Sequence, residues 1–312
     1  MNCILSTNHD ARFNLAAEEF LLKESSLDYF MIYRNEPSVI IGKHQNALAE
    51  INHAYLDEHK IPLVRRLSGG GTVYHDLGNI NFLFIQSGEE GKLVDFKKFL
   101  LPILNVLQNI GIAAEYGGRN DLLIAEKKIS GNAEHVFRKR ILHHGTLLYS
   151  SNLSVLENIL RVTPGKYFDK AVQSVRSKVT NISDHLEPDL PVEEFTIKIF
   201  ADIKSQLAFS SDYAFNEAEI ARINSLVENK YGTWKWNYGY SPDFEFKVTG
   251  TMDGHQIQFM IMVREGNILQ LNWNKADIEE KLVKSIESEL AGRKFYEKEI
   301  AGILLKRKIQ IK

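Results

Sequence analysis

The strongest constraint in the sequence is a run of three glycines, Gly69 to Gly71, between two apolar stretches. Glycine loses more backbone entropy on folding than any other residue, so three in succession are costly unless the backbone must approach another body closely. Arg65 and Arg66 precede the run, and His75 follows it. Exposed backbone N–H groups beside arginine side chains suit an anionic ligand such as a phosphate or a carboxylate.

The glycine run does not match the common phosphate-binding motifs. It lacks the G-x-x-x-x-G-K-[ST] pattern, and no G-x-G-x-x-G opens a helix here. The alternative interpretation is a plain glycine hairpin or bulge between two strands. The glycines alone leave both interpretations open. The neighbouring Arg65, Arg66, Ser68 and His75 favour a ligand-binding loop.

Length and composition predict a globular protein with one large domain and one small domain. The chain has 312 residues, of which 44% are hydrophobic and 25% are charged, and its formal net charge is -2. A net charge this close to zero does not indicate a nucleic-acid or membrane partner. No apolar stretch approaches the length of a membrane span, and the first residues do not resemble a secretory signal.

The single cysteine, Cys3, excludes an intrachain disulfide and fits a reducing compartment. We therefore expect a cytoplasmic protein. The position of Cys3 near the N-terminus is also a poor place for a catalytic thiol.

Hydrophobic periodicity predicts a mixture of helices and strands over the first 230 residues or so. The expected helices cover 13–22, 49–58, 94–110, 192–207 and 218–227. The expected strands cover 28–33, 38–41, 80–85, 121–125, 136–142 and 143–149.

An aromatic and glycine-rich stretch at 231–242 indicates a domain boundary. Beyond it, alternating apolar residues between 244 and 271 predict a three-stranded meander, with turns at Asp253-Gly254 and at 265–267. Two helices are expected at 276–290 and 296–306. We therefore predict two domains, 1–238 and 243–312, the second a small α+β domain.

A second informative stretch, 117–149, carries polar side chains at the ends of its expected strands. These are Arg119, Asn120, Asp121, Lys128, His143 and His144. A solvated surface hairpin is the alternative for the lysines, and a structural role is the alternative for the histidines. Adjacent residues of a strand point to opposite faces, so the two histidines are not expected to share a metal ion. No Cys/His cluster has the spacing of a zinc site.

Five motifs occur together between residues 13 and 183, and together they resemble the lipoate–protein ligase A family. In chain order they are RRLSGGGTVYHDLGNINF, GRNDLLI, KKISGNA, HHGTLL and SVRSKVTNI, the last containing Arg176 and Lys178. The stretch WKWNYG at 234–239 resembles the junction to the C-terminal accessory domain of that family.

The resemblance implies a class II synthetase-like, biotin–lipoyl ligase catalytic domain of α/β or α+β type, followed by a small α+β domain. It also implies a two-step reaction with ATP and Mg²⁺. The carboxylate of lipoate is first adenylated, and a lysine of an acceptor domain then attacks lipoyl-AMP. The implied substrates are lipoate or octanoate, and the implied acceptors are 2-oxoacid dehydrogenase E2 subunits and the glycine-cleavage H protein.

The resemblance also assigns roles to particular residues. Lys128 is the implied catalytic lysine, Asp121 the implied Mg²⁺ ligand, and residues 173–181 the loop that covers the adenylate. The implied ligand-binding residues are Arg66, Ser68, Gly71, Thr72, Val73, Tyr74, His75, Asn120, Asp121, Lys128 and Ala133. The apolar tail of the acyl group needs an apolar slot, for which Val39, Ile40 and Leu83 are candidates.

Three alternatives have distinct requirements. An octanoyl- or lipoyl-transferase that forms an acyl-enzyme needs a catalytic cysteine, and this chain has only Cys3. A biotin ligase needs a different arginine–glycine signature. A non-catalytic module that binds lipoyl domains would not need Lys128, which is present. Lipoate-dependent exchange between ATP and pyrophosphate separates these possibilities.

Overall fold

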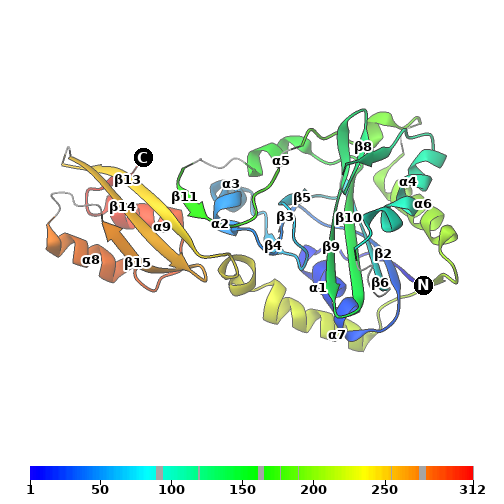
Figure 1. Cartoon of the computed structure of the whole chain (residues 1–312), viewed down its shortest axis with the longest axis horizontal. Helices are drawn as coiled ribbons and strands as arrows, with labels where there is room; N and C mark the ends of the chain where they lie inside the picture. The colour runs from blue at the N-terminus through cyan, green and yellow to red at the C-terminus, as the bar shows by residue number, and fades with distance from the viewer. Residues whose placement is uncertain are drawn as a thin grey trace. The chain divides into compact units, whose positions relative to one another are not determined.

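The computed structural model describes residues 1–88, 94–118, 120–160, 165–175, 177–188, 190–253, 255–273 and 279–311. The chain forms two compact units, which are drawn in Figure 1. The first unit contains Met1–Lys43, Asn52–Leu160 and Ser174–Thr233. The second contains His44–Ile51, the described part of 161–173, and Trp234–Lys312. Whether residues 243–312 act as a separate accessory domain stays a prediction.

The first unit is built on an eight-stranded sheet in the order β12-β1-β2-β6-β10-β9-β8-β7. The strand β1 runs parallel to β2 and β12, and every other neighbouring pair in this sheet is antiparallel. The strands are β1 (Asn2–Leu5), β2 (Tyr29–Arg34), β6 (Asn79–Ser87), β7 (Glu115–Gly117), β8 (Asp121–Ile124), β9 (Lys127–Phe137), β10 (Arg140–Leu148) and β12 (Ser211–Asp212).

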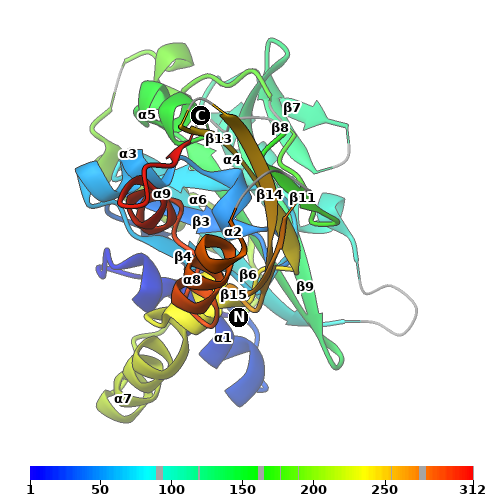
Figure 2. The ribbon, with the colours of Figure 1, turned by 90° about the vertical axis from the view of Figure 1, so that its left-hand side faces the viewer.

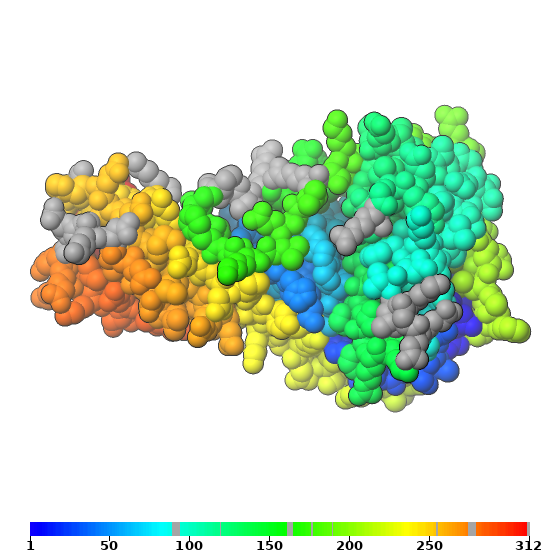
Figure 3. All heavy atoms as spheres, in the orientation of Figure 1, coloured from blue at the N-terminus to red at the C-terminus, as the bar shows by residue number. Residues whose placement is uncertain are grey.

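Successive side chains of a strand point to opposite faces, so the sheet has two separate surfaces to cover. Different helices cover each of them. On one face, α4 (Phe96–Asn109) and α6 (Val192–Gln206) bury an apolar core with residues such as Phe30, Phe82 and Phe84. On the other, α1 (Ala11–Glu24) contacts β6 and β10. The atoms of α4, in cyan, are part of the surface that faces the viewer in Figure 3.

A small three-stranded sheet carries the glycine run. It has the order β4-β3-β5, with β3 (Ser38–Ile41) parallel to β4 (Leu63–Arg65) and antiparallel to β5 (Val73–His75). The glycines connect β4 to β5. The remaining helices of this unit are α3 (His53–His59), α5 (Leu153–Ile159), α7 (Glu217–Leu226) and the short η1 (Ser183–His185) and η2 (Val227–Tyr231).

The second unit is a five-stranded antiparallel sheet with two helices on one face (Figure 2). Its apolar core includes Phe246, Phe259, Ile286 and Leu304. The strands are β11 (Tyr167–Asp169), β13 (Phe244–Met252), β14 (His255–Arg264), β15 (Asn267–Trp273) and β16 (Gln310–Ile311). The helices are α8 (Glu280–Leu290) and α9 (Glu297–Leu305), with the short α2 (Ala47–Glu50) and η3 (Lys235–Gly239) also in this unit.

Most of the expected elements are present, and two expectations were wrong. The helix expected at 49–58 is two helices, α2 and α3, because Asn46 and Asn52 each cap a new one. The hairpin between β9 and β10 turns at Arg138, which adopts a positive φ of 56°, and not at residue 142. The expected three-stranded meander is confirmed as β13, β14 and β15, and its sheet also contains β11 and β16. Gly254 and residues 276–278 lie outside the described residues. Over the described ranges, no helix combines the length and apolar character needed to cross a membrane.

Candidate active site

The glycine loop, residues 68–72, has a backbone that other residues could not easily adopt. Gly70 has a φ of +89°, and a Cβ there would lie 3.0 Å from Nη2 of Arg66. A Cβ on Gly71 would lie 3.2 Å from Oγ and 3.3 Å from Cα of Ser174. Glycine is therefore favoured at position 70 by the positive φ, and at position 71 a side chain would have to displace Ser174 by a few tenths of an ångström.

The side chain of Arg66 holds this loop from within. Nη2 donates hydrogen bonds of 2.7 Å to the carbonyl oxygens of both Gly69 and Gly71. Nη1 donates to the carbonyl of Ile40 and Nε to Oγ of Ser68. Burial lowers the pKa of Arg66 to about 10, which leaves the guanidinium charged at neutral pH. Its charge therefore lies directly behind the loop.

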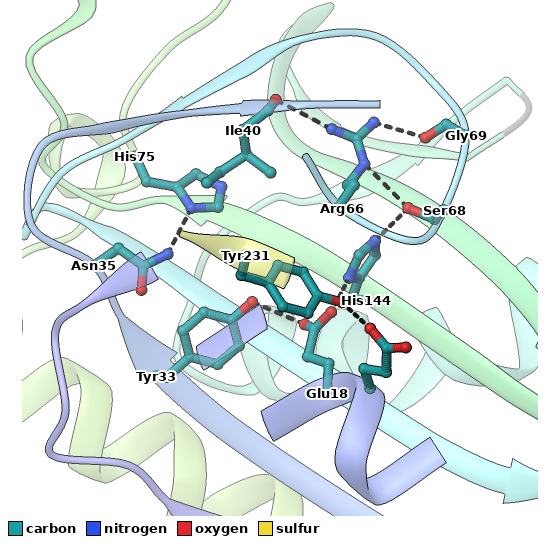
Figure 4. A network of polar contacts seen from close by, with 11 residues as sticks. Glu18, Tyr33, Asn35, Ile40, Arg66, Ser68, Gly69, His75, His144 and Tyr231 are labelled. Carbon is teal, nitrogen blue, oxygen red and sulfur yellow. Dashed lines mark hydrogen bonds and ion pairs between the residues drawn. The ribbon is translucent and has the colours of Figure 1, made fainter. Parts of the chain in front are cut away.

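Behind Arg66, a chain of buried hydrogen bonds extends to helix α1 (Figure 4). Oγ of Ser68 lies 2.6 Å from Nε2 of His144, and Nδ1 of His144 lies 2.8 Å from Oε2 of Glu18. Tyr33 donates from its hydroxyl to the other oxygen of Glu18 at 2.8 Å. Burial, followed by the negative charge of Glu18, raises the pKa of Tyr33 well above its ordinary value. The chain thus joins the segment that follows β4 to β10, β2 and α1.

His75 presents a neutral N–H group in the same region. Nδ2 of Asn35 donates to Nδ1 of His75 at 3.0 Å, because Oδ1 of Asn35 accepts from Asn14. This assignment leaves the ring proton on Nε2, which has no hydrogen-bond partner among the described residues. Burial, and then the positive charge of Arg66, lower the pKa of His75 to about 3. The ring is therefore a neutral donor at physiological pH.

A second cluster lies on β8 and β9. Nζ of Lys128 forms an ion pair of 2.8 Å with Oδ1 of Asp121, whereas Lys127 is exposed. A Cβ on Gly131 would lie only 3.1 Å from Nζ of Lys128, so this glycine leaves room for the ammonium group. Of the two adjacent lysines, Lys128 is the one held in place.

Asn120 and Asn132 fix the start of β8 against β9. Nδ2 of Asn120 donates to the carbonyl of Asn132, and Nδ2 of Asn132 donates back to the carbonyl of Asn120 at 2.9 Å. Asn132 also donates to Oγ of Ser130. Asn120 directly precedes Asp121, so this reciprocal pair sets the position of the carboxylate beside Lys128.

Residues 174–175 contact the first cluster, and residues 177–181 include contacts with the second. At one end, Oγ of Ser174 accepts a hydrogen bond of 2.9 Å from the backbone N–H of Thr72. At the other, the backbone of Lys128 bonds to Lys178 and Thr180. This segment contains most of the expected adenylate loop, and its contacts link the glycine loop to Lys128. Arg119 and Arg176 lie outside the described residues.

The other predicted site residues lie on strands next to these clusters. Val73, Tyr74 and His75 form β5, and Ala133 on β9 pairs with His144 on β10. His143 and His144 point to opposite faces, as predicted, because His143 binds Glu134 and packs on Phe99 in the apolar core. The candidates for an apolar slot, Val39, Ile40 and Leu83, are fully buried, and the structure does not test that role.

Sequence reasoning did not find Glu18 or Tyr33, included Ser174 and Asn132 only as members of longer motifs, and left the role of His144 open. One signal was available for Glu18. Glu18 and Glu19 are adjacent carboxylates in the middle of a largely apolar helix. Because such a helix is mostly buried, carboxylates there are unusual and indicate specific partners. The partners of Ser174 and His144 in the glycine loop, Thr72 and Ser68, are far away in the sequence.

The residues beside Lys128 are compatible with Mg²⁺. Magnesium in nucleotide-binding sites is held by one or two carboxylates together with substrate phosphates. Asp121 supplies one carboxylate. The described residues contain no group of three or more His, Cys, Asp or Glu side chains arranged to hold a metal by themselves. They therefore fit an ion carried by a nucleotide and not a cage built from protein alone.

Residues 10–204 match the family described as "Lipoyl protein ligase A/B catalytic domain". This segment covers more than half of the chain and includes the glycine loop, Lys128 and Asp121. The chain belongs to this family of lipoate–protein ligases. It is an enzyme family, and the predicted mixed α+β ligase fold is confirmed.

Individual members of the family are similar over most of the chain. Lipoate–protein ligase 1 of Staphylococcus aureus (strain Mu50) is 40% identical over 261 residues, which cover 83% of this chain and 79% of that protein. A crystal structure of lipoate–protein ligase A bound with ATP superposes with a TM-score of 0.65 at 27% identity, over 77% of this chain and 100% of that one. A bi-partite lipoate protein ligase of Thermoplasma acidophilum, studied with its E2 lipoyl domain, gives 0.67 at 27% identity, over 77% and 96%.

Proposed function

We propose that this lipoate–protein ligase activates lipoate with ATP and transfers the acyl group to a lysine of an acceptor domain. In the first step, a carboxylate oxygen of lipoate attacks the α-phosphorus of ATP, and pyrophosphate leaves. In the second, the neutral amine of the acceptor lysine attacks the acyl carbon, an amide forms and AMP leaves. The observation that carries the proposal is the preformed cation of Lys128, connected by segment 174–181 to a glycine loop backed by Arg66.

The arrangement supports the first step electrostatically. Bringing a carboxylate to a phosphate opposes two negative charges, and fixed donors in a partly dry site stabilise the transition state. In this proposal Lys128 donates hydrogen bonds to both the carboxylate of lipoate and the α-phosphate of ATP, since its ammonium is a compact charge with three donors. The neutral Nε2–H of His75 is assigned as a further donor to the acyl-adenylate.

For Mg²⁺, we assign Asp121, with the phosphates of ATP as the remaining ligands. When bound, the ion offsets the negative charge of the phosphates and of the departing pyrophosphate. Asn120 acts on this site by holding the backbone that carries Asp121.

Several further assignments belong to the proposal. The acyl substrate is lipoate or octanoate, and the acceptors are E2 subunits of 2-oxoacid dehydrogenases and the glycine-cleavage H protein. The enzyme is placed in the cytoplasm, and residues 243–312 are proposed to form an accessory domain.

A transferase that works through an acyl-enzyme is disfavoured by the single thiol of the chain. Cys3 is 1% exposed, and burial raises the pKa of its thiol. A raised pKa lowers the fraction of the nucleophilic thiolate.

The proposal is tested by exchange of labelled pyrophosphate into ATP, measured with and without lipoate. We expect exchange that depends on lipoate and on Mg²⁺, followed by a mass increase on a purified lipoyl domain. Parallel reactions with octanoate and biotin define the acyl preference. A folded protein that shows no lipoate-dependent exchange, but transfers the acyl group from an acylated carrier, would be a transferase.

A further inference from the structure

Asn46 is a fully buried amide that the proposed chemistry does not use. It caps the short helix α2, since its Oδ1 accepts a hydrogen bond of 3.0 Å from the backbone N–H of Leu48. A backbone N–H can only donate, so this bond identifies the oxygen of the amide. The nitrogen, Nδ2, therefore faces Asp169 and donates to its Oδ2 at 2.8 Å. An amide fits this position because one side faces a donor and the other an acceptor.

Asp169 is the last residue of β11, and it directs the chain that follows. Its other oxygen, Oδ1, accepts a hydrogen bond of 2.9 Å from the backbone N–H of Ala171, which makes a turn after the strand. The backbone N–H of Val172 then bonds to the carbonyl oxygen of His44 at 3.3 Å. Both ends of this turn are thus hydrogen-bonded to residues 44–46, which lead into α2 beside β11 (Figure 1).

The strand β11 gives this turn a fixed base. It pairs with β13, and Asp169 lies opposite Phe244 in this ladder. The ring of Tyr167 packs against Phe246 and Phe295, which belong to the apolar core of the second unit. The carboxylate of Asp169 is therefore presented from a strand whose position is set by a sheet and by a core.

From this turn the chain continues directly to the glycine loop. Ser174 follows the turn after one intervening residue, and its Oγ accepts a hydrogen bond of 2.9 Å from the backbone N–H of Thr72. Lys43 directly precedes residues 44–46, and its backbone N–H bonds to the carbonyl oxygen of Ser68 at 2.8 Å. Consecutive Cα atoms are only about 3.8 Å apart. The bonds that hold the turn therefore also limit where Ser174 can lie.

We propose that Asn46 and Asp169 are positioning residues for the adenylation reaction. By fixing the turn after β11, they place Ser174 against the glycine loop and set where the expected adenylate loop, residues 173–181, begins. Their effect passes through Ser174, and neither side chain is assigned to the reacting atoms. The inference rests on the proposed function, in which the glycine loop and the adenylate loop bind the nucleotide.

Exchanging the two side chains tests the pair, because the hydrogen-bond pattern can be broken and then restored. In Asn46→Asp the cap of α2 is kept, since aspartate caps a helix as well as asparagine does, but two acceptor oxygens now face each other. In Asp169→Asn the new amide accepts from Ala171, so its N–H group faces Nδ2 of Asn46. The double variant Asn46→Asp/Asp169→Asn again places a donor opposite an acceptor at each of these contacts.

The kinetic readout is the KM for ATP in lipoate-dependent pyrophosphate exchange. We expect this KM to rise roughly 5-fold to 50-fold in each single variant, with the KM for lipoate near wild type, and to recover in the double variant. Asn52→Asp is the matched control, because Asn52 caps α3 through the N–H of Tyr55 and the same substitution keeps that bond. The control should stay near wild type.

Three kinetic outcomes would overturn the proposal. The first is a double variant whose loss is the product of the two single losses. The second is a loss in Asn52→Asp equal to that in Asn46→Asp. The third is a defect confined to the KM for lipoate.

Hydrogen–deuterium exchange gives a readout that does not depend on activity. The amides of Ala171 and Val172 should lose protection in each single variant and regain it in the double variant, while protected amides of β14 confirm that the unit is folded. Unchanged protection of these two amides in the single variants would overturn the proposal even if activity falls. A wild-type enzyme with no lipoate-dependent pyrophosphate exchange would instead refute the proposed function, and amide protection would still decide whether the pair holds the turn.

Discussion

The ammonium of Lys128 lies 2.8 Å from Oδ1 of Asp121 on the neighbouring strand β8. The two side chains are 27% and 24% exposed, so the pair is reachable by a ligand and yet held in a defined place. The neighbouring Lys127 is exposed and takes no part in this pair. The two lysines therefore form a natural comparison within one strand.

Replacing Lys128 by alanine should lower lipoate-dependent pyrophosphate exchange by about 10²–10³-fold, the usual cost of removing one preorganised donor to a transition state. Among the described residues, Lys128 is the cation paired with Asp121, so the variant has no other ammonium group at this position. Lys127→Ala should remain near wild type. Exchange rates for both variants, with circular dichroism to confirm folding, provide the measurement. Equal losses in the two variants would show that Lys128 has no special role.

The glycine loop and Lys128 could be predicted from sequence because their signals are local. The three glycines are consecutive, and KKISG is likewise a single short segment elsewhere in the chain, in which strand alternation separates Lys127 from Lys128. The strands and helices with clear periodicity were also predictable. Turn positions were harder, because Arg138 and Lys139 carry none of the glycine, proline or asparagine that usually mark a hairpin.

The support behind the site could not be predicted, because its partners are distant in the sequence. Glu18 and His144 are 126 positions apart, and Ser68 and His144 are 76 apart. Only the order of strands in the sheet brings α1 and β10 together. The composition of the second unit was equally hard to predict from the sequence. It contains His44–Ile51, which lie within the range 1–238 expected for the first domain.

The glycines of the loop should differ in their tolerance of a side chain. We expect Gly70→Val and Gly71→Val to abolish adenylation with a modest effect on folding, because position 70 has a positive φ and position 71 lies against Ser174. Gly69→Ala should retain most of the activity, since a Cβ there meets no atom within 4 Å. Adenylate formation and thermal unfolding of the three variants are the measurements. Full activity in a folded Gly71→Val protein would contradict the required close approach.

Acid should destabilise the protein through His75. Its pKa is about 3 in the fold, below the ordinary value of 6.5, so the unfolded state binds a proton that the folded state excludes. This stabilisation is complete above pH 6.5 and is lost as the pH falls toward 3, by up to about 1.4 kcal/mol per pH unit. Denaturant unfolding of wild type and His75→Gln between pH 7 and pH 4 should therefore give a shallower loss in the variant.

The exposed His255 serves as a control for this measurement. His255→Gln should keep the slope of the wild type, while the half-buried His135, whose pKa burial lowers to about 4, contributes equally to all three proteins. Parallel slopes for wild type and His75→Gln would mean that His75 is not buried in its neutral form.

Gly145 should be required for the position of Asn132. These residues pair across β10 and β9, and a Cβ on Gly145 would fall 1.9 Å from Oδ1 of Asn132 and 2.5 Å from Cζ of Phe82. Something must shift, and overpacking of this kind typically costs about 1–3 kcal/mol. Asn132 holds the carbonyl of Asn120, so its displacement should also disturb Asp121. We therefore expect Gly145→Ala to lower both the free energy of unfolding and the rate of adenylation.

Combining Gly145→Ala with Asn132→Ala separates the two effects. Removing the amide relieves the closest clash, so the double variant should regain part of the lost stability, whereas adenylation should remain low because the bond to Asn120 is still missing. Urea unfolding and pyrophosphate exchange on the single and double variants test this. If activity recovers together with stability, Asn132 matters only for packing, and the bond between Asn132 and Asn120 does not position Asp121.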